Sequence, residues 1–266
     1  MLKYLLKISV FFSAVLSVQC EIHPFLVIIA ALRNNSFYEI AGGTLINSEW
    51  VLCAESCRNL DVDGGSSTAI GGIEKDMSIQ TAQKRLVIMW ITHPEYEESS
   101  VNLALLKLEY AFVLNEYLSP VSILTIDRKM KSDGTSELVH PLKKQVKRGK
   151  RVDVISDELT VLPQKICEST LNQTIYKHEF CSRFDRNDSR LNWNGPLMTR
   201  RRQLGVFSRN ISHRNEMYLV FTRIDSQVDY LMTMCKQVGR SSSHHSHSNY
   251  FILIFFTSNV CVFMYK

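Results

Sequence analysis

Short apolar runs separated by polar or glycine-containing turns recur through the middle of this chain of 266 residues. Strand-sized runs with turn signals between them are typical of a β-sandwich or β-barrel. The pattern therefore predicts an all-β domain. Its strands are expected at Leu26–Leu32, Arg85–Thr92, Leu103–Leu108, Arg151–Ile155, Leu159–Leu162, Gln203–Phe207 and Leu219–Thr222.

A segment that follows these runs has a different period. Val228, Leu231 and Cys235 are spaced as on one face of a helix. They come behind Ser226 and Asp229, whose spacing is that of a capping box, in which side chains of the first turn bind the free backbone N–H groups. We therefore expect one helix after the strands.

The N-terminal end has the composition of a targeting segment. Lys3 and Lys7 lie beside an apolar run, Ile8–Val18, which ends in small residues. This order predicts a secretory signal peptide at residues 1–20. A signal anchor is the alternative, but the apolar run is short for a membrane span. We expect a secreted chain whose folded domain occupies residues 21–236.

The C-terminal end reads as a second processing signal. Small residues at Ser241–Ser243 lie in a polar, Ser/His-rich spacer at residues 237–249, and a hydrophobic tail follows at residues 250–266. That order predicts a glycosylphosphatidylinositol anchor at the plasma membrane; a transmembrane anchor and an uncleaved tail remain alternatives. His244–His247 is interpreted as part of the spacer, because a flexible tract lacks the second shell of a metal site. We expect neither a metal nor a cofactor.

Three parts of the domain carry a family resemblance. Gly42–Asn47 with Trp50–Cys57 resembles the GGTLIN and WVLTAAHC segments of trypsin-like serine proteases. Asn102–Leu108 resembles their DIALLKL segment, and Leu191–Leu197 resembles their GDSGGPL segment. Shorter similar stretches extend the resemblance over about residues 23–236. It implies two six-stranded antiparallel β-barrels with a C-terminal helix.

The resemblance places inert residues where the catalytic triad would be. Ser56 occupies the histidine position, Asn102 the aspartate position and Trp193 the position of the nucleophilic serine. An indole N–H offers no lone pair for attack, and a hydroxyl is no proton acceptor near neutral pH. Replacing the acid of a triad by an amide alone costs about 10⁴ in turnover. We therefore expect no enzyme activity.

Substrate binding and activation are also expected to be lost. The resemblance puts the base of the specificity pocket at Asn187 and its two small walls at Asn210 and Leu219, so side chains would fill the pocket. The aspartate that binds a newly formed N-terminus in active members is Asn192 here, and the Ile-Val-Gly-Gly segment is absent. Losing both partners together avoids a buried, unpaired carboxylate.

Cysteine placement follows the family in part. The resemblance implies a disulfide between Cys167 and Cys181, whereas the family partner position of Cys57 is Ala41. Connectivity among the other cysteines cannot be deduced from sequence. The pairing of Cys53, Cys57 and Cys235 therefore stays open.

Glycosylation sequons and basic runs bear on the partners. The net charge is +5, and many of the arginine and lysine residues are grouped in short runs. One run could bind a polyanion, and we expect no nucleic-acid partner; this run is Arg200, Arg201 and Arg202. Four sequons suit a secreted chain: Asn34, Asn172, Asn187 and Asn210.

These features favour a catalytically inactive serine protease homologue, secreted or held at the cell surface. We expect it to act by binding an extracellular protein, such as a protease, an inhibitor or a receptor, in a decoy, cofactor, adhesion or regulatory role. The surface around Trp193 is the expected contact, because tryptophan is favoured at interface hot spots. A residual serine-type endopeptidase and a polyanion-binding surface protein are the alternatives.

Overall fold

The computed structural model describes residues 23–33, 36–61, 66–72, 82–96, 101–121, 135–141, 154–184, 194–199 and 202–241. The predicted signal peptide and hydrophobic tail lie outside these residues. So do several predicted site residues: Asn34, Asn187, Asn192, Trp193, Arg200 and Arg201.

The first barrel is a closed antiparallel sheet in the strand order β1-β2-β3-β6-β5-β4. Its strands carry many buried aliphatic side chains, among them Ile29, Leu52 and Leu105. On β5 the burial alternates, so that Leu86 and Ile88 face solvent, as the period of two in a strand requires. The strands are β1 (Leu26–Arg33), β2 (Ser36–Asn47), β3 (Trp50–Cys53), β4 (Ser66–Gly71), β5 (Gln83–Thr92) and β6 (Ala104–Leu108).

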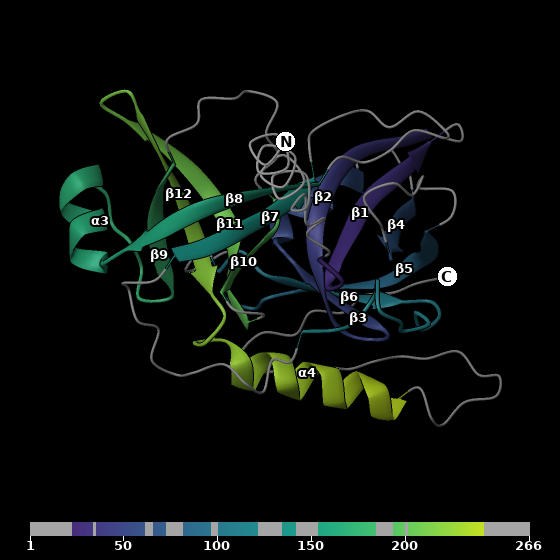
Figure 1. The fold of residues 1–266 in the computed structure, drawn as a ribbon. Coiled ribbons are helices and arrows are strands. Elements are labelled where there is room, and N and C mark those ends of the chain that lie inside the picture. Colours follow the sequence, from purple (N-terminus) through teal and green to yellow (C-terminus); the bar gives the residue numbers. More distant parts are fainter. Residues whose placement is uncertain are drawn as a thin grey trace, which may run out of the picture. The chain divides into compact units, whose positions relative to one another are not determined.

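The second barrel repeats this arrangement in the order β10-β11-β12-β9-β8-β7. Aromatic rings fill it: Phe221 stacks on Phe180 with centroids 5.5 Å apart and meets Phe207 edge-on at 6.1 Å. Figure 1 shows this barrel in teal and green and the first in purple and blue. Its strands are β7 (Thr135–Pro141), β8 (Val154–Leu162), β9 (Glu179–Phe184), β10 (Pro196–Thr199), β11 (Arg202–His213) and β12 (Glu216–Arg223).

Both barrels contribute to one apolar cluster, which joins them. Ile28 and Ile70 of the first barrel are grouped with Val139 and Met198 of the second, and all are buried. Beside this cluster the Gly42 N–H of β2 donates to the carbonyl oxygen of Asn194 at 2.7 Å. A Cβ on Gly42 would lie 2.7 Å from that same oxygen, so this close approach of two backbones needs glycine.

In the part of the chain that the structure describes, η1 (Glu55–Asp61) and α3 (Gln164–Leu171) are short helical segments between strands. The 3₁₀ segment η1 follows β3, and α3 lies between β8 and β9. The disulfide Cys167–Cys181, which the family resemblance implied, ties α3 to β9. Asn172 ends α3 in the left-handed conformation, with φ at 50°.

A C-terminal helix, α4 (Val228–Ser241), follows the second barrel. The chain divides into a unit that ends at Val228 and contains both barrels, and a unit from Asp229 onward. The predicted capping box is wrong: Ser226 lies two residues before the helix, and its hydroxyl donates to the carbonyl of Arg223 at 3.2 Å. None of the described helices is both long and apolar enough to cross a membrane.

The predicted fold of two six-stranded barrels with a C-terminal helix is confirmed. Periodicity alone found only part of it. The described part of the predicted run Arg151–Ile155, from Val154 onward, and the run Leu159–Leu162 belong to one continuous strand, β8, in which polar residues at Ser156–Glu158 interrupt the apolar pattern. The runs Gln203–Phe207 and Leu219–Thr222 are parts of the longer β11 and β12, which form a hairpin out to His213 and Glu216.

Candidate functional site

Two residues that the sequence resemblance assigns to triad positions, Ser56 and Asn102, lie together at the junction of the barrels. Ser56 belongs to η1, and Asn102 lies just before β6. The Ser56 backbone N–H donates to Asn102 Oδ1 at 3.0 Å, and Asn102 Nδ2 donates to Ser56 Oγ at 3.4 Å. The same Nδ2 also donates to the carbonyl oxygen of Ser208 on β11 at 3.1 Å. Asn102 therefore links both barrels through one buried side chain.

This network can exist only with an amide at position 102. An ionised carboxylate accepts hydrogen bonds but donates none, so it could not bond to the carbonyl of Ser208. The amide oxygen and nitrogen of Asn102 both have partners, and the group carries no charge. Neither a general base nor a carboxylate to orient one is present in this cluster. Its hydrogen bonds support the local fold.

The third triad position, Trp193, lies outside the described residues, but the segment after it is held in place. Asn194 accepts the hydrogen bond from Gly42, and the Gly195 carbonyl accepts from Phe207 N–H at 3.3 Å. A Cβ on Gly195 would come within 2.1 Å of the Val139 carbonyl oxygen. The chain that leaves Trp193 is therefore tied to β2, β7 and β11.

The two predicted pocket walls are paired residues on neighbouring strands of one sheet. Asn210 of β11 pairs with Leu219 of β12, and residues opposite each other in an antiparallel pair point to the same face. Leu219 is 0% exposed and belongs to the aromatic core of the second barrel, whereas Asn210 is exposed above it. A leucine thus occupies interior space on this face. The ladder continues to His213 and Glu216, so the two walls are joined by a regular hairpin.

A buried ion pair next to these walls was not predicted from the sequence. Arg209 of β11 binds Glu179 of β9 through two hydrogen bonds, one of them from Nη2 to Oε2 at 3.0 Å. The Glu179 side chain is 0% exposed and also accepts from the Tyr176 N–H at 3.1 Å. Charged residues inside apolar strands were the available signal. Their pairing was not readable, because 30 residues separate them.

The contacts of His140 and His23 are not those of a triad histidine. His140 is buried and bonds through Nε2 to Asp157 at 3.0 Å, with no serine hydroxyl among its described partners. His23 lies 3.8 Å from Glu137, whose carboxylate also accepts the hydroxyl of Ser156. In that group the acid lies between serine and histidine, so the imidazole cannot take the serine proton.

His93 is also an unsuitable general base. It is 4% exposed, and its Nδ1 accepts the backbone N–H of Glu95 at 3.2 Å. Burial lowers the pKa of the His93 imidazole, against the opposing effects of Glu95 and Gln227. Both the burial and the local hydrogen bond indicate a structural role.

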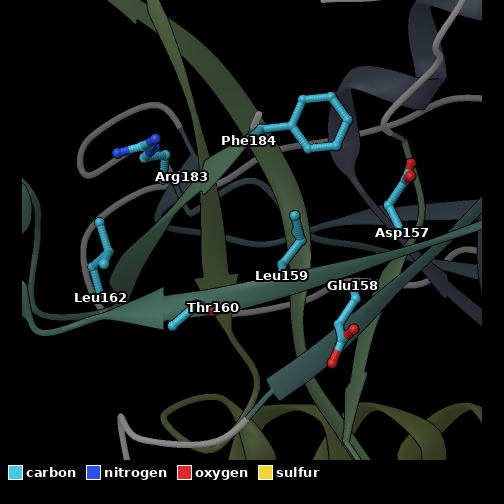
Figure 2. Close-up of a pocket in the computed structure, with 7 residues that line it drawn as sticks. All are labelled: Asp157, Glu158, Leu159, Thr160, Leu162, Arg183 and Phe184. Atoms are coloured by element: carbon cyan, nitrogen blue, oxygen red, sulfur yellow. The ribbon is translucent and has the colours of Figure 1, made fainter. Parts of the chain in front are cut away.

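A cavity of about 580 Å³ lies elsewhere on the second barrel. Figure 2 shows two carboxylates, Asp157 and Glu158, on one side and Arg183 on the other. Asp157 already bonds to His140, and Arg183 pairs with Glu216 at 3.3 Å. None of the positions marked by the resemblance lines it. The lining residues are Asp157, Glu158, Leu159, Thr160, Leu162, Arg183 and Phe184.

Other predicted sites fall on the surface. Asn172 is exposed in the turn after α3, and Arg202 is exposed at the start of β11. Within the described ranges no group of histidine, cysteine or acidic residues is arranged to hold a metal ion.

The family model for trypsin matches residues 17–231. The chain belongs to the trypsin family of serine proteases. Rabbit (Oryctolagus cuniculus) coagulation factor IX is 26% identical over 160 residues, which are 58% of this chain and 58% of that protein. Serine protease SP24D of Anopheles gambiae is 31% identical over 100 residues, 36% of this chain and 35% of that protein. The matches therefore span less than two thirds of either relative.

Solved structures of trypsin-family proteins share the fold. Neuropsin, a serine protease expressed in the limbic system of mouse brain, superposes with a TM-score of 0.62 at 18% identity, covering 80% of this chain and 94% of that one. Kallikrein-related peptidase 10, in a complex with Zn²⁺, gives a TM-score of 0.59 at 21% identity, covering 82% and 96%. Such low identities show the trypsin fold alone.

The Arg209–Glu179 pair predicts a clear stability difference between single and double variants. Arg209→Met leaves a buried carboxylate without its counter-charge, so we expect the free energy of unfolding to fall by about 3 to 5 kcal/mol. Arg209→Met with Glu179→Met should recover most of this loss, because an apolar pair of similar volume avoids the desolvation cost. Urea unfolding monitored by circular dichroism measures both.

Arg183→Met is the matched control for that experiment. Arg183 pairs with Glu216, and both side chains are about half exposed, at 53% and 43%. An exposed pair of this kind contributes less than about 1 kcal/mol. A loss in Arg209→Met no larger than in Arg183→Met would contradict the burial argument.

The environment of His93 predicts that stability falls in mild acid. Because burial lowers the pKa of His93 below 6.5, the unfolded chain binds the proton more readily. The free energy of unfolding should therefore decrease as the pH drops below about 6.5, until the lower folded-state pKa is passed. We expect His93→Gln to make this decrease shallower in urea unfolding at a series of pH values. His213→Gln is the control, and pH profiles of His93→Gln and wild type that run parallel would refute the assignment.

Proposed function

We propose that this trypsin-family chain is a non-catalytic homologue that acts by binding an extracellular protein. One observation carries the proposal: the Asn102 amide bonds at once to Ser56 and to the Ser208 carbonyl. Proton transfer in a serine protease needs an imidazole held by a carboxylate. Here both positions carry neutral groups that are bonded to each other, and the sequence has tryptophan at the nucleophile position.

The packing around the predicted pocket supports the same proposal. Leu219 is buried in the core of the second barrel and pairs with Asn210 of β11. The residue before Asn210, Arg209, is held by its hydrogen bonds to Glu179. A substrate side chain would have to displace leucine from an apolar core. That cost opposes productive substrate binding in addition to the missing chemistry.

A bare strand edge offers a way to bind without cutting. Among the described strands, β10 accompanies β11 only as far as Val206. From Arg209 to His213, β11 has β12 on one side and no described strand on the other. An exposed edge can accept an extended segment of another protein through main-chain hydrogen bonds. We therefore favour a polypeptide partner that docks beside the inactive cleft.

The other functions have less support. The named relatives are serine proteases or a coagulation factor, which keeps a residual endopeptidase as the second candidate. Only Arg202 of the arginine run is described, so a polyanion site has no geometric argument here. Secretion and a lipid anchor remain proposals that rest on the two ends of the sequence.

The catalytic part is tested with an activity-based probe. Purified chain from a eukaryotic secretory host should not react with a fluorophosphonate probe and should leave a diverse peptide library intact near neutral pH. Trypsin treated in parallel is the positive control. Labelling of the chain that disappears when it is denatured first would establish a reactive serine and disprove the proposal.

The binding part is tested on a partner identified by proximity labelling at the cell surface. Trp193→Ala should weaken the affinity by about 30-fold, the loss of about 2 kcal/mol expected at a hot spot. Tyr110→Ala is the aromatic control, because Tyr110 is 67% exposed on the loop after β6 of the first barrel. Equal affinities of the wild type and Trp193→Ala would place the contact surface elsewhere.

A further inference from the structure

Two thiols meet in the interior of the first barrel, on either side of Ser56. Cys53 is the last residue of β3 and Cys57 belongs to η1, and each is 1% exposed. The Cys57 N–H donates to the Ala54 carbonyl at 3.1 Å, which turns the chain back on itself. The Cys57 thiol is thereby brought within hydrogen-bonding reach of Cys53.

Cys53 is a partner within reach of Cys57. Ala41 of β2, where the family resemblance places the usual partner, is fully buried and carries no sulfur. Elsewhere the chain contains a disulfide, Cys167–Cys181, and such bonds persist in oxidising compartments. An adjacent pair of thiols in the same chain would meet the same oxidants.

We propose that Cys53 and Cys57 form a redox couple, which exists as the buried dithiol of this structure and as a disulfide that closes a loop over Ser56. This inference is independent of the proposed function. The oxidant is a low-molecular-weight disulfide of the secretory pathway, such as glutathione disulfide. One cysteine thiolate attacks it, releases one glutathione thiolate and forms a mixed disulfide. The second cysteine thiolate then attacks the protein sulfur and releases the other, so two thiols are oxidised as one disulfide is reduced to two thiols.

Burial determines when the exchange can occur. Desolvation raises the pKa of the Cys53 thiol, and the neighbouring Cys57 and Glu55 raise it further. The reactive thiolate is therefore scarce in the folded chain. Exchange should take place before the first barrel closes or when β3 and η1 open locally, and the state then formed should persist.

The residues enclosed by the loop connect it to the candidate site. Ser56 bonds to Asn102, and Glu55 accepts the indole N–H of Trp90 at 2.8 Å. Closing the loop restricts the turn that places both residues. Trp90 fluorescence can therefore report the redox state of the pair.

Glu55 also makes the bond directly testable by peptide mapping. A protease that cleaves after glutamate cuts between Cys53 and Cys57, so the two fragments stay together only through a disulfide. The full chain is unfolded and refolded over a series of reduced and oxidised glutathione ratios, trapped with an alkylating reagent and digested without reductant. We expect the Cys53 and Cys57 fragments to be linked on the oxidised side and separate after reduction.

Two variants sharpen the result. Cys235→Ala should still give the linked fragments, and its intrinsic fluorescence should change along the glutathione series as in the wild type. Cys53→Ala should lose both the link and the fluorescence change. Separately alkylated Cys53 and Cys57 at every glutathione ratio, or a link from Cys57 to Cys235, would overturn the proposal, and mapping of the wild type decides this even if a variant misfolds.

Discussion

The arrangement of the site depends on the hydrogen bonds of the Asn102 side chain. Its Oδ1 accepts a hydrogen bond from the Ser56 N–H of the first barrel, and its Nδ2 donates one to the Ser208 carbonyl of the second. One amide therefore holds η1 and β11 together. Beside it, the Gly42–Asn194 hydrogen bond and a shared apolar cluster bring the backbones of the two barrels close. Because buried polar groups must find partners, an amide with both ends satisfied is stabilising here, whereas a carboxylate would leave the Ser208 carbonyl without its donor.

The neighbouring changes compensate one another in the same way. Arg209 balances the charge of Glu179, whose side chain is inaccessible to water, and the Tyr176 N–H donates a further hydrogen bond to the same carboxylate. Leu219 completes an aromatic core in which Phe180 and Phe221 already stack. An active site holds polar groups ready for a substrate. Here Asn102 and Glu179 instead have internal partners, and Leu219 fills interior space with hydrocarbon.

The sequence predicted the architecture because ordered segments such as Gly42–Asn47 and Asn102–Leu108 carry a family pattern. The alternation of apolar residues was less informative, since strands buried on both faces, such as β3 and β6, have no polar side to alternate with. Contacts between distant residues were beyond reach: nothing local to Arg209 names Glu179 as its partner. The capping box failed because Ser226 found a backbone acceptor in the preceding turn, an alternative that short polar side chains often take.

The contacts of Asn102, Ser56 and Leu219 bear on the proposal that this chain is not catalytic. In an enzyme the nucleophile, base and acid are kept apart from stable partners so that they can react, and this readiness costs stability. Here Asn102 and Ser56 are bonded to each other and Leu219 belongs to the core, so replacing any one of them would remove a contact that the fold uses. Under the proposed function, these same contacts stabilise the barrels and leave no group free for the reaction. The proposed docking edge begins beyond them, at Arg209 of β11, where no described strand lies opposite β12.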